Sequence, residues 1–178
     1  MAYILTALFC LGSSAACHLC YVRSERVSSI LTSVDYWGIC ILFLGSCYPY
    51  ISFKYACGPF VAWRYIFTTM IFILTLLCMW ATVQKTFFTP GRRVALFMLF
   101  ALSCFVPSLM LYVWDDPKNA LSPNPGPYLW PILCYTIGIF FYISRIPERF
   151  SKIGVFDYLG ASHQIFHCTV LVAIYFNF

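Results

Sequence analysis

Three histidines are the side chains in this sequence best suited to chemistry, and two of them have the spacing of metal ligands. His163 and His167 lie four residues apart at the start of the last apolar run. In a helix this spacing places both imidazoles on one face, one turn apart, where they can reach the same ion. The third histidine, His18, lies near the end of the first apolar run.

Two more polar side chains accompany the histidines. Ser14 precedes His18 by four residues, so a helix brings both to one face, and Asp35 lies where the second apolar run begins. Each also has an ordinary structural interpretation. A serine in an apolar helix commonly bonds the carbonyl four residues back, and an aspartate at a helix border is a good N-cap.

Taken together, these five residues predict a zinc centre with catalytic chemistry. Catalytic zinc commonly has three protein ligands and one open position for water, whose pKa falls to about 7. We therefore predict zinc bound by His18, His163 and His167, with Asp35 as the base that accepts a proton from the bound water. Ser14 is predicted to hydrogen-bond either that water or the developing oxyanion. Haem is disfavoured, because residues four apart on one helix cannot occupy opposite faces of a porphyrin.

The composition is that of a polytopic membrane protein. Hydrophobic residues make up 62% of the sequence and charged residues 10%, with a mean hydropathy of +0.82. A soluble domain carries about 25% charged residues. The net charge of +5 does not indicate a nucleic-acid partner, because the basic residues lie in short loops between apolar runs.

The ten cysteines do not form the disulfide framework of a secreted domain, because most lie inside apolar runs, where cysteine behaves as a small hydrophobe. Cys17 and Cys20 flank His18 in a pattern like half of a zinc knuckle. No second cysteine pair of suitable spacing follows, which argues against thiolate ligation. Cys47 and Cys57 lie near one membrane face, and the sequence leaves open whether they pair.

The fold class that follows is an all-α bundle of transmembrane helices in a single domain, residues 1–178. A helix of about 20 apolar residues crosses the hydrocarbon core. Pro49 and Pro107 fall inside apolar runs and are expected to kink their helices. Six runs approach the required length: Ala2–Tyr21, Tyr36–Phe53, Trp63–Val83, Val94–Trp114, Tyr128–Ile143 and Leu159–Phe178.

The loop charges orient these six predicted spans. Alternate loops place eight basic residues on one side and three on the other, so the first side is expected in the cytoplasm. The eight are Arg23, Arg26, Lys85, Arg92, Arg93, Arg145, Arg149 and Lys152; the three are Lys54, Arg64 and Lys118, offset by Asp115 and Asp116. All five site residues then lie at one depth, toward the cytoplasmic side of a plasma membrane or endomembrane.

Five strings spread over nearly the whole sequence carry a recognisable pattern. They are Ser14-x3-His18, Arg23-Ser24-Glu25-Arg26-Val27, Asp35-Tyr36-Trp37-Gly38-Ile39, Tyr142-Ile143-Ser144-Arg145-Ile146-Pro147-Glu148-Arg149-Phe150, and Phe156-Asp157 leading to Ser162-His163-Gln164-Ile165-Phe166-His167. These strings resemble the progestin and adipoQ receptor family, which includes the adiponectin receptors. The serine, aspartate and histidine pattern is shared more widely, with alkaline ceramidases and haemolysin-III-like proteins.

This resemblance implies a seven-helix bundle with a cytoplasmic N-terminus. It also implies zinc held by His18, His163 and His167, with Asp35 at the zinc-bound water and Ser14 nearby. The family's first transmembrane helix and its N-terminal cytoplasmic segment have no counterpart here, so we expect that part of the N-terminal region is missing. The stretch 151–155 replaces a shorter family connection.

The resemblance further implies ceramidase-type hydrolysis of a lipid amide, with signalling in lipid metabolism and an extracellular protein or steroid as ligand. One alternative is a receptor in which zinc only ties the first and last predicted helices together. Another is an inactive fragment or scaffold. Proton or metal transport is disfavoured, because the remaining spans offer almost no ionisable residues for a relay.

Overall fold

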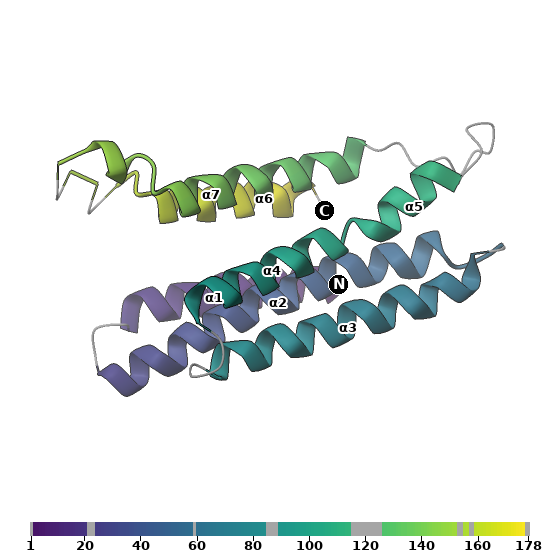
Figure 1. The fold of residues 1–178 in the computed structure, drawn as a ribbon, viewed down its shortest axis with the longest axis horizontal. Coiled ribbons are helices and arrows are strands. Elements are labelled where there is room, and N and C mark those ends of the chain that lie inside the picture. Colours follow the sequence, from purple (N-terminus) through teal and green to yellow (C-terminus); the bar gives the residue numbers. More distant parts are fainter. Residues whose placement is uncertain are drawn as a thin grey trace. The chain divides into compact units, whose positions relative to one another are not determined.

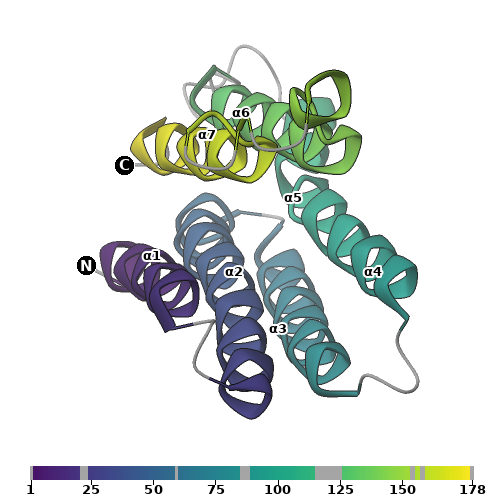
Figure 2. The ribbon, with the colours of Figure 1, turned by 90° about the vertical axis from the view of Figure 1, so that its left-hand side faces the viewer.

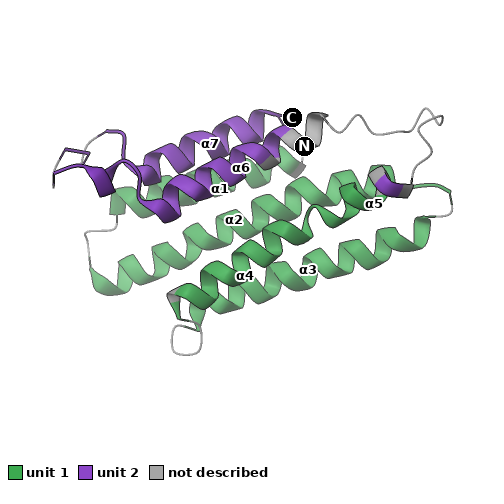
Figure 3. Cartoon of the chain, turned by 45° about the horizontal axis from the view of Figure 1, so that its top comes forward, with its two compact units in different colours: residues 1–110 green, residues 111–178 purple. Residues whose placement is uncertain are grey.

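The computed structural model confirms the predicted all-α class (Figure 1). The structure describes residues 2–20, 24–58, 60–84, 89–114, 126–152, 155–156 and 159–176, and these ranges contain no strand. The chain divides into two compact units, Met1–Met110 and Leu111–Phe178, coloured separately in Figure 3. The expectation of a single transmembrane domain stays a prediction.

The first unit is built from four helices that pack in sequence order, each against the next (Figure 2). They are α1 (Ala2–Cys20), α2 (Glu25–Lys54), α3 (Val61–Val83) and α4 (Pro90–Ser103). α5 (Val106–Trp114) follows α4 and crosses the boundary between the units. The second unit contains α6 (Gly126–Ser144), a 3-10 turn η1 (Glu148–Phe150) and α7 (Ser162–Phe176).

α2 begins well before the apolar run that predicted it. Ser24 caps the helix, since its hydroxyl accepts the backbone N–H of Val27 at 3.2 Å, and Glu25 suits the positive N-terminal end. The polar residues that follow bond back to their own helix. The hydroxyl of Thr32, for example, donates to the carbonyl of Ser28 at 2.8 Å. The apolar run predicted from Tyr36 to Phe53 lies within α2 but covers only its apolar part, because hydropathy does not register a polar but internally bonded first part.

Two glycines of α2 let it approach α1 closely. A methyl group added at Gly38 would meet the Ser13 hydroxyl and the Cys10 backbone, and one added at Gly45 would meet Thr6. Because the later glycine of α2 meets the earlier residue of α1, the two helices run antiparallel. Small residues at such positions are typical of helix interfaces in membranes, where dispersion contacts replace the hydrophobic effect as the driving force.

α2 also contacts α3 through a polar bond and α4 through aromatic rings. The Trp37 indole N–H donates to the Thr82 hydroxyl at 2.9 Å and to the Met79 carbonyl at 3.2 Å. In the contact between α2 and α4, the rings of Phe43 and Phe100 pack edge-on with their centroids 5.3 Å apart. These contacts make α2 the central helix of the first unit.

The predicted kink at Pro107 is a full break between α4 and α5. Pro107 cannot donate a backbone hydrogen bond, and α4 ends at Ser103 before α5 begins at Val106. The Tyr55 hydroxyl, from the residue after α2, donates to the Pro107 carbonyl at 2.6 Å. Pro49, the other proline expected to kink a helix, lies inside α2, which continues through it.

In the second unit, α6 and α7 pack against each other. Gly138 of α6 is the close-approach point, because a methyl group there would overlap the side chain of Thr169 in α7. The rings of Trp130 and Phe176 stack at 6.0 Å. This pairing fixes α7 along its length, and α7 is the helix that carries two of the three histidines.

Four described helical stretches are long and apolar enough to cross a membrane: Tyr3–Cys20, Glu25–Lys54, Val61–Val83 and Gly91–Met110. Ser162–Phe176 is a shorter apolar helix. Several residues used in the sequence predictions lie outside the described residues: Arg23, Lys85, Asp115, Asp116, Lys118, Ile153, Gly154 and Asp157. The described cysteines, Cys47 and Cys57 among them, are free thiols.

We predict that Gly38→Ala destabilises the protein, because its methyl group must displace the Ser13 hydroxyl and would lie only 3.0 Å from the Cys10 Cα. Overpacking of this kind costs about 1–3 kcal/mol, and thermal unfolding in detergent measures it. Gly12→Ala is the matched control, since nothing lies within 4 Å of a methyl group there and alanine is the better helix former. Equal unfolding temperatures for the two variants would contradict the close approach.

Candidate metal centre

His163 and His167 lie side by side at the start of α7. Their Nε2 atoms are 3.1 Å apart, and their ring centroids are 4.7 Å apart with the planes at 79°. Both side chains are half-buried. The four-residue spacing therefore brings the two nitrogens together, as the helix geometry predicts.

This arrangement fits a shared metal ion. Zinc bonds imidazole nitrogen at about 2.0–2.1 Å with tetrahedral angles, which places two ligand nitrogens about 3.3 Å apart. The observed 3.1 Å is close to that separation. Without an ion, one ring can donate a hydrogen bond to the other, so the chain itself holds the two nitrogens near their ligand positions.

Aromatic rings hold the histidine pair in place. Tyr142, near the end of α6, lies 5.5 Å from the His163 ring and 5.7 Å from the Phe166 ring. Phe166 in turn lies 5.6 Å from His167. No role in the site was predicted for Tyr142 and Phe166 from the sequence. Because they come from different helices or different turns, spacing alone did not reveal that they surround the histidines.

The N-terminal end of α7 is held by a carboxylate from η1. Glu148 Oε1 accepts the backbone N–H of Ser162 at 2.7 Å and the Ser162 hydroxyl at 2.9 Å. Partial burial alone would raise the pKa of Glu148. The hydrogen bonds that its carboxylate accepts, with the Arg145 guanidinium, outweigh this effect and lower that pKa below its ordinary value of 4.5.

The other predicted site residues belong to the first unit. His18 is exposed in the last turn of α1. Ser14 is buried on the same helix, on the stripe that it shares with Cys10 and Cys17, which are also buried. These three positions are four and three residues apart and therefore form one face of α1.

Asp35 lies on the side of α2 that faces α1. Its carboxylate interacts electrostatically with the thiols of Cys10 and Cys17, the two residues that flank Ser14 on the buried face of α1. Gly38, one turn further along α2, lies against the same part of α1. The structure therefore brings Asp35 to the level of Ser14.

The alternative that Asp35 is a helix N-cap is wrong. Ser24 is the cap, and Asp35 lies well inside α2, about 15 Å along its axis at 1.5 Å per residue. Its side chain is half-buried. A carboxylate inside a membrane helix is costly unless it has a partner or a function, so its position strengthens the functional interpretation.

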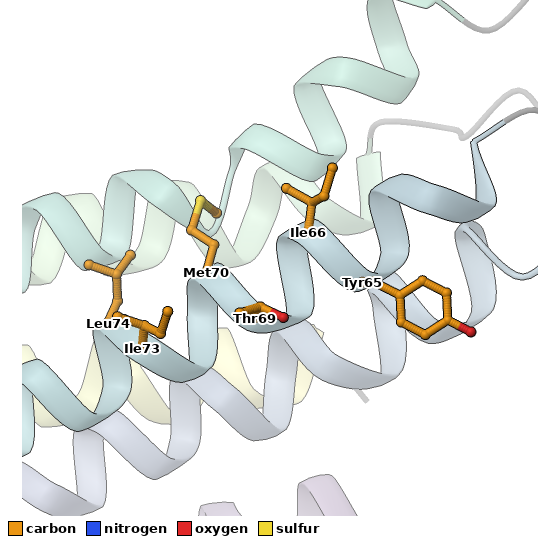
Figure 4. Close-up of a pocket in the computed structure, with 6 residues that line it drawn as sticks. All are labelled: Tyr65, Ile66, Thr69, Met70, Ile73 and Leu74. Atoms are coloured by element: carbon orange, nitrogen blue, oxygen red, sulfur yellow. The ribbon is translucent and has the colours of Figure 1, made fainter.

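The structure also contains an apolar groove that none of the predicted site residues lines (Figure 4). All of its lining residues lie on α3, on a face suited to contact with lipid tails: Tyr65, Ile66, Thr69, Met70, Ile73 and Leu74. The groove and the candidate site therefore have no residue in common.

The described helices and the paired imidazoles define a class, an all-α polytopic membrane protein with two adjoining donors for a metal ion. Comparison with known proteins gives the family. Residues 1–178 match the family described as Haemolysin-III related, and the chain belongs to it. It is an integral membrane protein of the adiponectin-receptor-like, seven-helix type.

Three relatives illustrate the similarity. Heptahelical transmembrane protein 4 of Arabidopsis thaliana is 36% identical, over 99% of this chain and 46% of its own length. The adiponectin receptor protein of Drosophila melanogaster is 30% identical, over 99% and 40% respectively. Heptahelical transmembrane protein ADIPOR2 of rice (Oryza sativa subsp. japonica) is 33% identical, over 97% and 75%. The chain thus spans less than half the length of the first two.

We predict that acid weakens the attachment of α7 to η1. Because the pKa of Glu148 in the folded chain is lowered, its contribution to stability is complete above its ordinary pKa of 4.5 and is lost as the pH falls through the lowered value. Thermal unfolding in detergent at pH 6 and at pH 3 should differ more for the wild type than for Glu148→Gln. Equal pH dependence in both would contradict this prediction.

Proposed function

We propose that this chain forms a zinc-dependent, ceramidase-type site that hydrolyses a lipid amide within an adiponectin-receptor-like membrane protein. The observation that carries the proposal is the 3.1 Å separation of the His163 and His167 Nε2 atoms. The position of Asp35 at the level of Ser14 supports it, because it pairs an acid–base group with a hydroxyl donor inside a membrane helix pair.

In this proposal His18 is the third zinc ligand. Each of the three histidines offers one ring nitrogen, and three neutral imidazoles are a known ligand set for catalytic zinc. His18 and Ser14 share one helix at a spacing of four, so a site that includes His18 also lies near Ser14 and Asp35. The predicted membrane orientation supports the proposal, because it places all five residues toward the cytoplasmic side.

Zinc bound by these histidines would supply Lewis-acid activation of water and of the amide carbonyl. Asp35 would accept a proton from the attacking water and return it to the amide nitrogen as the carbon–nitrogen bond breaks. The Ser14 hydroxyl would donate a hydrogen bond to the oxygen that becomes negative at the reacting carbonyl. The products are a fatty acid and an amine.

The substrate class follows from the setting. An amide that reaches a site between apolar helices must itself carry apolar chains, so a ceramide-like membrane lipid fits best. Release of a lipid product would connect the site to signalling in lipid metabolism. We propose a plasma membrane or endomembrane location, with an extracellular protein or a steroid as the ligand that regulates the whole protein.

The alternative is a receptor in which zinc is structural, or a scaffold without activity. The hydrolase and the non-enzymatic alternatives differ in what they require of Asp35. A hydrolase needs its carboxylate to move a proton, whereas a structural zinc site requires only the three histidines. Substitutions at that position therefore separate them.

We predict that the purified wild-type chain binds about one zinc ion and that His167→Ala loses it, because two imidazoles remain where three are needed. Elemental analysis after dialysis measures the zinc-to-protein ratio. Cys168→Ala is the matched control, since Cys168 is the exposed next residue of α7 and should bind zinc as the wild type does. Equal zinc content in the wild type and His167→Ala would exclude this ligand set.

We predict that Asp35→Asn keeps the zinc and lowers kcat for a ceramide by about 10²-fold or more, because the general base is lost. Ser14→Ala should also keep the zinc and lower kcat by about 10²-fold. Mass spectrometry of the released fatty acid measures turnover in detergent or in nanodiscs. A wild type that binds zinc but cleaves no ceramide would contradict the hydrolase and favour the receptor.

A further inference from the structure

Glu148 links two segments of the second unit, the turn that follows α6 and the start of α7. It is the acidic residue of Ile146-Pro147-Glu148-Arg149-Phe150, and its partner Ser162 begins the histidine helix. We infer that Glu148 is a positioning residue: it fixes the first turn of α7 and so fixes the direction of the His163 imidazole. The inference rests on the proposed function for its consequence in zinc binding.

The hydrogen bonds that Glu148 accepts come from the N-terminal end of α7. The first backbone N–H groups of an α-helix have no partner within the helix. Glu148 Oε1 accepts the N–H of Ser162, the first residue of α7, and the hydroxyl of the same serine. A carboxylate is the favourable group at this end, because the helix dipole is positive there.

A second side chain completes this end of α7. Gln164 Oε1 accepts the backbone N–H of Gly160 at 2.7 Å and that of Ala161 at 3.3 Å. Gln164 is the third residue of the helix, so this is the returning half of a capping box. Gly160 has a φ of +84°, a conformation that glycine adopts without strain.

Glu148 can hold α7 because its own segment is ordered by hydrogen bonds. The N–H of Arg149 donates to the Arg145 carbonyl at 2.8 Å, and the N–H of Phe150 to the Pro147 carbonyl at 3.0 Å. The Ser151 N–H donates to the carbonyl of Glu148 itself at 3.1 Å. The carboxylate therefore projects from a closed turn that directly follows α6.

His163 is the residue that gains most from this cap, because it directly follows Ser162. Each residue advances a helix by about 100°, so unwinding of the first turn would turn the His163 ring away from His167. His167 lies a full turn further and stays in the helix. A frayed first turn would therefore keep one ligand of the pair in place and release the other.

The experiment compares zinc affinity by chelator competition in wild type, Glu148→Ala and Glu148→Gln, using the full chain in detergent. Loss of a group that orients a metal ligand typically costs 10–100-fold in affinity, and we expect this for Glu148→Ala. Glu148→Gln keeps an acceptor oxygen and should stay within a few-fold of the wild type. Glu25→Ala, an exposed acid in the first turn of α2, is the matched control and should not change zinc affinity.

Hydrogen exchange without zinc supplies a second readout. In Glu148→Ala, peptides that cover residues 160–167 should exchange faster, while α6 peptides should exchange as in the wild type. Faster exchange confined to this segment, with weaker zinc binding and rescue by glutamine, supports the inference. Equal zinc affinity in wild type and Glu148→Ala overturns it.

The outcomes also separate this inference from the proposed function. A wild type that binds no zinc contradicts the zinc-dependent hydrolase, and the exchange data then decide the role of Glu148. Unchanged exchange at residues 160–167 would show that the carboxylate does not fix this turn. A uniform loss of stability across both helices would also overturn the inference, because it would make Glu148 a general structural residue.

Discussion

The close approach of α1 and α2 is the contact on which the first unit depends. Because Gly38 and Gly45 carry no side chain, the α2 backbone approaches the Cys10 backbone and the Ser13 and Thr6 side chains, and this fixes the antiparallel register of the two helices. In a bilayer such contacts supply much of the association between helices, since lipid tails are as apolar as the helix faces. The same register brings Asp35 to the level of Ser14, so the packing of small residues decides where the Asp35 carboxylate lies in this helix pair.

The second unit solves a different problem, which is to hold two rotatable imidazoles near their ligand positions. The spacing of His163 and His167 supplies the shared face, and the Tyr142 and Phe166 rings restrict the space around it. The carboxylate of Glu148 supplies the bonds that the first turn of α7 lacks. Each contribution is small, but a metal site tolerates little misplacement of its ligands, so the contributions act together.

The sequence predicted the helical class, the family and the histidine pair, because these depend on composition, strings and spacing along one helix. It also predicted the interruption near Pro107, which follows from the missing N–H. It did not predict that α2 begins at Glu25. Ser24 caps the helix and internally bonded serines and threonines form its first turns, but the low hydropathy of these residues hides them. Nor did the sequence predict the contact between Glu148 and Ser162, which joins residues on either side of a loop and has no periodic signature.

The Tyr55 hydroxyl gives α2 a further consequence. About a third of the way along α2, Asp35 lies against α1. Just beyond the C-terminal end of α2, the buried Tyr55 is hydrogen-bonded to Pro107, near the interruption between α4 and α5. One continuous helix, about 45 Å long at 1.5 Å per residue, therefore links the acid to the broken span. A displacement of α2 along its own axis would therefore move the Asp35 contact and the Tyr55 contact together.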